Sequence, residues 1–122
     1  MDKRELNKYV DQASLSIVDA MKKIDANTKQ ILFITDDNGR LIGAVTDGDI
    51  RRFLIKTGDL QAPIREAMNH RPLVLSENER NRAADFCHEN HINAVPLIGN
   101  DGRPVDIVFK EETTTLPSTS DD

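Results

Sequence analysis

The sequence predicts an α/β (α+β) fold made of two repeats, each with three short strands and two helices. Two observations lead to this fold class. First, apolar runs of strand length alternate with segments whose apolar residues recur every three or four positions, which is the spacing of one helix face. Second, a shift of 63 residues aligns the two halves, placing Gly39 on Gly102 and Val45 on Val108 with the apolar strands in phase.

The composition restricts the class of protein. With 122 residues, the chain is long enough for one compact unit but too short for two independent cores. Aromatic residues make up 4% and Trp is absent, so the stacking platforms of single-stranded nucleic-acid binders are missing. A formal net charge of −5 also works against binding to a phosphate backbone. We therefore expect no nucleic-acid partner.

The single cysteine and the three histidines do not form a metal-ligand pattern, so we expect no metal site. Cys87 cannot form an internal disulfide, and a lone cysteine on an apolar helix face is usually a small core residue. No apolar stretch approaches the ~20 residues of a membrane span. No apolar segment follows the charged N-terminus. We therefore expect a cytoplasmic protein with no membrane partner.

The first repeat is predicted over residues 1–60. Its main helix carries apolar residues at i, i+3, i+4 and i+7, with Ser14 or Ser16 as a cap. Asn38-Gly39 stands between two apolar runs, which predicts a hairpin and therefore two neighbouring antiparallel strands. The expected elements are a short helix over 1–8, a brief strand at 9–10, a helix over about 17–24, strands at 31–35 and 41–45, and a helix over 47–56 that ends at Thr57-Gly58.

The second repeat is predicted over residues 61–112, because the same order of elements begins again. The expected elements are a helical turn at 63–68, strands at 72–75, 94–98 and 105–109, and a helix over 78–90. Residues 113–122 contain one large apolar side chain, Leu116, and cannot bury enough surface to order themselves. We expect this segment to be a disordered tail.

The junction between the strand at 41–45 and the following helix contains Thr46 and Asp49, and two interpretations of this pair are open. In the first, Thr46 is the N-cap and Asp49 its partner in a capping box, so both residues only complete the helix. In the second, the hydroxyl and the carboxylate bond the vicinal diol of a ligand. Gly43 and Gly48 would then let that ligand approach the backbone.

The second repeat differs at this junction. The 63-residue shift places Asp106 at the position of Gly43, Phe109 at that of Thr46 and Glu112 at that of Asp49. The second half therefore has neither the hydroxyl nor the glycines, and only the carboxylate, as Glu112, is kept. We expect at most one functional cleft.

Taken together, these residues resemble a pair of CBS (cystathionine-β-synthase) domains, also called a Bateman module. The resemblance covers about residues 9–112 and is carried by three segments: Gly43-x-x-Thr46-x-x-Asp49, residues 16–20, and residues 91–97. It implies two pseudo-symmetric repeats, each with a small three-stranded mixed sheet, packed through their sheets. The stretch from Thr46 to Arg52 is similar to the form found in CBS pairs attached to sugar-nucleotide transferases and sugar-phosphate isomerases.

The resemblance also implies a function. Such pairs bind adenosine nucleotides (AMP, ADP or ATP) in the clefts between repeats and act as regulators rather than enzymes, with no required cofactor. Thr46 and Asp49 match the positions that hold the ribose, and Gly43 allows close approach. Arg51 and Arg52 are either solvated charges on the helix or, for one of the two, a contact to phosphate; we assign that contact to Arg52. A nucleotide sugar is an alternative ligand, and an enzyme of sugar-nucleotide metabolism is the expected regulated partner, attached or separate.

A ligand-free assembly module is the alternative function. In that case the helices would pair in a dimer and no nucleotide would bind. We expect a homodimer under either hypothesis, because the helices carrying Ile50, Phe53 and Leu54, or Ala83, Phe86 and Cys87, are too apolar for two small sheets to cover. An enzyme is not expected, since the sequence shows no nucleophile with a matching base.

Overall fold

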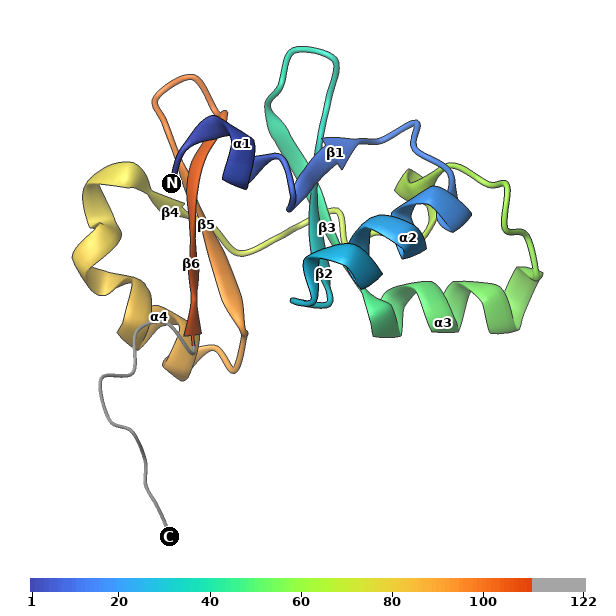
Figure 1. Cartoon of the computed structure of the whole chain (residues 1–122). Coiled ribbons are helices and arrows are strands. Elements are labelled where there is room, and N and C mark those ends of the chain that lie inside the picture. Colours follow the sequence, from blue (N-terminus) through green and yellow to red (C-terminus); the bar gives the residue numbers. More distant parts are fainter. Residues whose placement is uncertain (111–122) are drawn as a thin grey trace, which may run out of the picture.

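The computed structural model describes residues 1–110, which form two three-stranded sheets placed side by side with helices on the outer sides (Figure 1). The predicted tail at 113–122 and Glu112 lie outside the described residues. The α/β fold class with two three-stranded mixed sheets is confirmed.

The first sheet has the order β1-β2-β3, with β1 parallel and β3 antiparallel to the central strand. Two helices of 11 residues pack on one side of it, and each begins at a side-chain N-cap, Ser16 or Thr46. Both end at a residue in the left-handed conformation, Thr28 or Gly58, as helix C-termini commonly do. The elements are α1 (Lys3–Leu6), β1 (Val10–Gln12), α2 (Ile17–Asn27), β2 (Ile31–Thr35), β3 (Leu41–Thr46) and α3 (Asp47–Thr57).

The second sheet repeats this topology with the order β4-β5-β6. Its elements are η1 (Ile64–Glu66), β4 (Leu75–Ser76), η2 (Glu77–Arg82), α4 (Ala83–Glu89), β5 (Ala94–Ile98) and β6 (Pro104–Phe109), where η denotes a 3-10 helix. Two expectations are wrong in detail. The strand expected at 72–75 is reduced to Leu75–Ser76, and the helix expected over 78–90 is a 3-10 segment followed by seven α-helical residues.

The reason for the divided helix lies at its start. Ser76 and Glu79 form a capping box, in which the side chain of Glu79 turns back to the backbone N–H of Ser76. Glu79 itself has non-helical angles of φ −106° and ψ 21°. The regular α-helix therefore begins only at Ala83, after this irregular turn.

The strand registers confirm the 63-residue repeat. In the first sheet Ile31 pairs with Thr46, and in the second Ala94 pairs with Phe109. Both hairpins turn through a glycine with φ +84°, Gly39 or Gly102, as the turn signals predicted. The two hairpins also touch, since the backbone N–H of Leu41 donates to the carbonyl of Gly102 at 3.0 Å.

Three apolar clusters hold the layers together. An outer core lies between each sheet and its helices, around Ile17 and Val45 in the first repeat and around Cys87 and Val95 in the second. A central core lies between the two sheets, which stand side by side in Figure 1, and it contains residues from β2, β3, β5 and β6. Its buried members are Tyr9, Phe33, Ala44, Ala94, Ile107 and Phe109.

The segment around η1 packs with the first repeat, although we expected residues 61–112 to form the second. Ala62, Ile64 and Met68 are members of the first outer core. Backbone bonds fix the segment there, since the N–H of Ile17 donates to Ala62 at 2.9 Å and the N–H of Ile64 donates to Leu15 at 2.6 Å. This packing carries the chain along β3 before it enters the second sheet.

The sheets cover more of the helices than we expected. Of the residues on which the homodimer prediction was based, Ile50, Ala83 and Cys87 are buried in the chain's own cores, whereas Phe53, Leu54 and Phe86 are half-buried. The chain itself therefore covers part of these helix faces. Among the described residues, no helix has the length and apolar character needed to cross a bilayer.

Candidate functional site

The junction between β3 and α3 carries the predicted pair Thr46 and Asp49. The backbone N–H of Asp49 donates to Thr46 Oγ1 at 3.2 Å, and the backbone N–H of Thr46 donates to Asp49 Oδ2 at 3.0 Å. This reciprocal arrangement is a capping box. It satisfies two backbone donors at the helix start and fixes both side chains at the edge of the sheet.

Arg52, one turn later on α3, donates from its guanidinium to Asp49 Oδ1 at 2.6 Å. The Asp49 side chain is 21% exposed, whereas that of Arg52 is 69% exposed. A Cβ at Gly48 would lie 3.4 Å from the Arg52 guanidinium, which is an ordinary van der Waals contact. Arg52 therefore orients the carboxylate from the solvent side.

Two adjoining cavities lie between the repeats, and we call them together the inter-repeat cleft. They share Ile31, Thr46 and Ile92. One cavity, of about 160 Å³, is mainly apolar and adds Phe33, Ala44, Asp49, Asn69, Pro72, Leu73 and Ala94. The other, of about 400 Å³, is polar and adds Lys29, Gln30, Asp47, Gly48, Arg51, His91 and Asn93.

The four residues predicted as a site occupy different places relative to this cleft. Thr46 lines both cavities and Asp49 lines the apolar one. Arg52 lines neither, and the arginine in the polar cavity is its neighbour Arg51. The two adjacent arginines therefore point in different directions, because successive residues of a helix are turned by about 100°.

Gly43 also lies outside the cleft lining, but the structure gives it a clear role. A Cβ at this position would meet the Met68 sulfur well inside van der Waals contact and the Asn69 carbonyl at 3.0 Å. Because Gly43 has no side chain, the segment after η1 can pair with β3: Asn69 N–H donates to the Ala44 carbonyl at 2.7 Å. Gly43 thereby places Asn69 at the apolar cavity.

Sequence reasoning missed the cleft residues that come from loops. Lys29 and Gln30 follow α2, while His91, Ile92 and Asn93 follow α4. The sequence gives a weak indication of these loops, because the helical spacing of apolar residues stops at both of them. Both loops also contain left-handed residues, Thr28, Gln30 and His91, that are not glycine. Such positions are uncommon for residues with a Cβ.

The pseudo-symmetric counterpart of Thr46 is Phe109, and it is 2% exposed. Its ring contacts that of Tyr9 in an edge-to-face arrangement, with ring centroids 4.9 Å apart. Lys29 Nζ lies 4.9 Å from the centroid of the same ring. Aromatic side chains therefore occupy the space that a hydroxyl borders in the first repeat.

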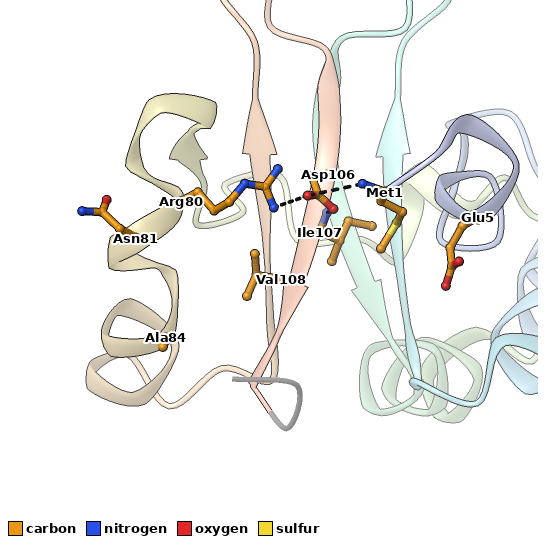
Figure 2. A pocket seen from close by; sticks show the side chains of 8 residues that line it. All are labelled: Met1, Glu5, Arg80, Asn81, Ala84, Asp106, Ile107 and Val108. Carbon is orange, nitrogen blue, oxygen red and sulfur yellow. Dashed lines mark hydrogen bonds and ion pairs between the residues drawn. The ribbon is translucent and has the colours of Figure 1, made fainter. Parts of the chain in front are cut away.

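Another cavity, of about 500 Å³, lies against β6 between α1 and the η2–α4 region (Figure 2). Its central acid, Asp106, is 5% exposed and stands at the position of Gly43. Arg80 and the α-amino group of Met1 both form ion pairs with this carboxylate. Asp106 and its two cationic partners already neutralise each other. This cavity is therefore less suited to bind a charged ligand than the inter-repeat cleft.

Other reactive groups lie away from the cleft. Cys87 is fully buried, and this burial raises the pKa of its thiol, which disfavours the nucleophilic thiolate. Within residues 1–110, no group of three His, Cys, Asp or Glu side chains is placed to hold a metal ion.

Comparison with known sequences adds a family match. Residues 12–56 match the family described as CBS domain. Arabinose 5-phosphate isomerase GutQ from Escherichia coli O6:H1 is 30% identical over 89 residues, which are 72% of this chain but 28% of that enzyme. Arabinose 5-phosphate isomerase KpsF from the same organism is 30% identical over 95 residues, 77% of this chain and 29% of that enzyme. The chain thus spans less than a third of these relatives.

Comparison with solved structures extends the likeness to both repeats. The CBS domain pair of protein MJ0100, in complex with 5′-methylthioadenosine and S-adenosyl-L-methionine, is 27% identical with a TM-score of 0.71, covering 85% of this chain and 86% of that one. A CBS domain protein from Pyrobaculum aerophilum, complexed with AMP, has a TM-score of 0.76 at 18% identity, covering 89% of this chain and 86% of that one.

Proposed function

This chain is a CBS domain pair, and we propose that it is a regulatory module that senses an adenosine nucleotide in the inter-repeat cleft. The observation that carries the proposal is the position of Thr46, whose side chain borders an apolar cavity on one side and a polar, cationic cavity on the other. A nucleotide has the same division, with an apolar base and an anionic phosphate joined by a ribose.

The apolar cavity suits the base. Ile31, Ile92 and Leu73 line it, and Leu73 is 45% exposed although it is a large apolar residue. A flat ring placed there would cover this exposed surface, and burial of apolar area is the general driving force for ligand binding. The amide of Asn69 offers a polar group at the same wall.

Asp49 and Thr46 suit the ribose. Each oxygen of Asp49 already accepts one hydrogen bond, from the Thr46 backbone and from Arg52. A carboxylate oxygen has two lone pairs, so each oxygen keeps capacity for one hydroxyl of a vicinal diol. The capping box and the diol interpretation are therefore compatible, because the cap holds the carboxylate in the orientation that a ribose would need.

The solved CBS pairs support an adenosine compound, since the ligands named with them are AMP, 5′-methylthioadenosine and S-adenosyl-L-methionine. The isomerase relatives support a sugar-phosphate enzyme as the regulated partner, attached or separate. We propose that ligand binding changes the packing of the repeats and so the activity of that enzyme. Such coupling requires the ligand to bind two states with different affinity.

We also propose a homodimer. The evidence for it is a set of exposed apolar side chains, and not the helix faces on which the sequence prediction was based. Ile55 on α3 is 77% exposed, and Leu60 and Met21 are 42% and 38% exposed. A large exposed apolar side chain at the outer helices favours contact with a second copy. Light scattering at tens of micromolar chain measures this, and a monomeric mass would contradict it. If the dimer formed and no nucleotide bound, the assembly function would replace the sensing function.

A thermal-shift panel tests the sensing function directly. The purified chain is melted with AMP, ADP, ATP, S-adenosylmethionine, 5′-methylthioadenosine, and cytidine and guanosine sugar nucleotides. Binding to the folded state raises the melting temperature by mass action. We expect an upward shift with at least one adenosine compound. An unchanged melting temperature and calorimetric heat across the panel would exclude the proposed function.

A further inference from the structure

We propose that the polar cavity of the inter-repeat cleft is a diphosphate subsite, which selects ligands with two or more linked phosphates over nucleoside monophosphates and uncharged nucleosides. This inference rests on the proposed function, since it concerns the same cleft, and it names the class of ligand that the cleft would take. This class of ligand includes free nucleoside polyphosphates and nucleoside-diphosphate sugars, because both contain linked phosphates.

The first argument is charge. Lys29 and Arg51 enter the cavity from different elements, the loop after α2 and the first turns of α3, and His91 adds an imidazole from the loop after α4. One acid, Asp47, lines the same wall. Two cationic side chains and one anionic side chain therefore line the cavity, in a chain whose formal net charge is −5, although the Lys29 ammonium also lies against the Phe109 ring. An acidic chain that gathers cations in one concave site creates a local preference for anions.

The second argument is the division of the two arginines. Arg52 is engaged by Asp49, whereas within residues 1–110 Arg51 makes no ion pair or hydrogen bond. The Arg51 guanidinium thus lines the cavity with its donors available for a ligand. A planar guanidinium can contact two phosphate oxygens at once, which favours arginine for this kind of recognition.

The third argument is size. The polar cavity, at about 400 Å³, has more than twice the volume of the apolar one, at about 160 Å³. A single phosphate occupies only a few water volumes, each about 30 Å³. If a ribose lies at Thr46 and Asp49, one phosphate fills only the near end, next to Gly48. Arg51 and His91, which line the same cavity, would then face a second phosphate.

Calorimetric titration of the whole chain with adenosine, AMP, ADP and ADP-glucose tests the subsite. We expect ADP to bind about tenfold more tightly than AMP, the effect of one further charge-assisted contact. Arg51→Gln should reduce this ratio to about two while changing AMP affinity less. Lys56→Gln removes the same charge from the far end of the same helix and should leave the ratio unchanged.

A second variant guards against an effect on folding. His91→Asn keeps a residue type that tolerates the left-handed φ of 56° found here, and it should also lower the ADP-to-AMP ratio. ADP-glucose that binds as tightly as ADP, or more tightly, assigns the subsite to nucleotide sugars. Weaker binding of ADP-glucose assigns it to free polyphosphates.

The contrary outcomes separate the two proposals. AMP and ADP binding with equal affinity to the unaltered chain, or an ADP preference that Arg51→Gln and His91→Asn both leave intact, would overturn the subsite while the sensing function stands. Failure of every adenosine compound to bind would overturn the sensing function and the subsite with it.

Discussion

Thr46 and Asp49 exchange hydrogen bonds, each side chain accepting from the backbone N–H of the other at 3.2 and 3.0 Å. This exchange orders the carboxylate before any ligand arrives, because it is part of the helix start. Preorganisation of this kind reduces the entropy lost on binding. The same two residues therefore contribute to both the stability of the chain and the geometry of the cleft.

Substitution of Asp49 separates these contributions. Asp49→Ala removes one half of the capping box, so we expect the free energy of unfolding without ligand to fall by about 0.5–2 kcal/mol. It should also abolish stabilisation by nucleotide, which for the unaltered chain at one hundred times the dissociation constant is about 2.7 kcal/mol. Melting curves with and without the best nucleotide measure both effects. Asp49→Asn keeps the shape and should lose most of the ligand response.

The chain contains a matched control for this experiment. Ser76 and Glu79 form the equivalent capping box at η2, and Glu79 pairs with Arg82 as Asp49 pairs with Arg52. Glu79→Ala should cost a similar amount of stability and leave the nucleotide-induced shift unchanged. If Asp49→Ala retained the full shift, the ribose assignment would be wrong whatever its effect on stability.

Gly43 and Gly48 should respond to alanine with opposite signs. Gly43→Ala forces a Cβ against Met68 and the Asn69 carbonyl, so we expect a loss of about 1–3 kcal/mol of stability. In Gly48→Ala the Cβ meets the end of a flexible Arg52 side chain, and the helical position favours alanine by up to about 1 kcal/mol. Urea unfolding of both variants gives the comparison. Equal destabilisation would contradict the close packing of Met68 on Gly43.

The aromatic contact between Tyr9 and Phe109 can be measured by a double-mutant cycle. Tyr9→Leu, Phe109→Leu and the double variant should give a coupling of about 0.5–1.5 kcal/mol, the usual value for an edge-to-face pair beyond its buried area. A cycle between Phe109→Leu and Ile24→Val is the control, because Ile24 belongs to the first outer core. That second cycle should be additive within about 0.5 kcal/mol.

Asp36 gives a prediction about pH. Its carboxylate accepts from the backbone N–H groups of Arg40 at 3.0 Å and Asn38 at 2.9 Å, and these bonds, chiefly that of Arg40, hold the pKa of Asp36 below its usual value. The unfolded chain therefore takes up this proton first as the pH falls. The stabilising effect of the carboxylate is fully present at neutral pH and is lost as the pH drops through the lower, folded pKa.

The measurement compares Asp36→Asn with the unaltered chain. The variant should be less stable at pH 7, and the difference should narrow below about pH 4. Asp37→Asn, at the next position of the same turn, removes the same charge and serves as the control for the change in net charge. A difference that stayed constant from pH 7 to pH 3 would show that the Asp36 bonds do not favour the charged form.

Much of the fold could be predicted because the determining signals are local. The turn glycines Gly39 and Gly102 mark both hairpins, and the Thr46 hydroxyl marks the start of α3. The 63-residue shift recovers the strand register, since a one-residue slip would turn every buried side chain to the other face. A turn glycine or a helix cap can be recognised from the few residues around it in the sequence.

The lining of the cleft could not be predicted in the same way. Ile92 and Ile31 meet there although they are distant in sequence, and only the packing of the two sheets brings them together. The choice between Arg51 and Arg52 depended on which of them bonds Asp49 and which lines the polar cavity. These are tertiary relations, so residue types and spacing alone did not decide them.

Phe109 has a consequence for the dose response. At the counterpart of Thr46 the described residues place the buried Phe109 ring against that of Tyr9, so the proposed function predicts one nucleotide for each chain. A single site obeys a hyperbolic saturation curve, which needs an 81-fold rise in ligand to pass from 10% to 90% occupancy. A sharper response therefore requires contact between chains, and duplicated repeats within one chain cannot supply it.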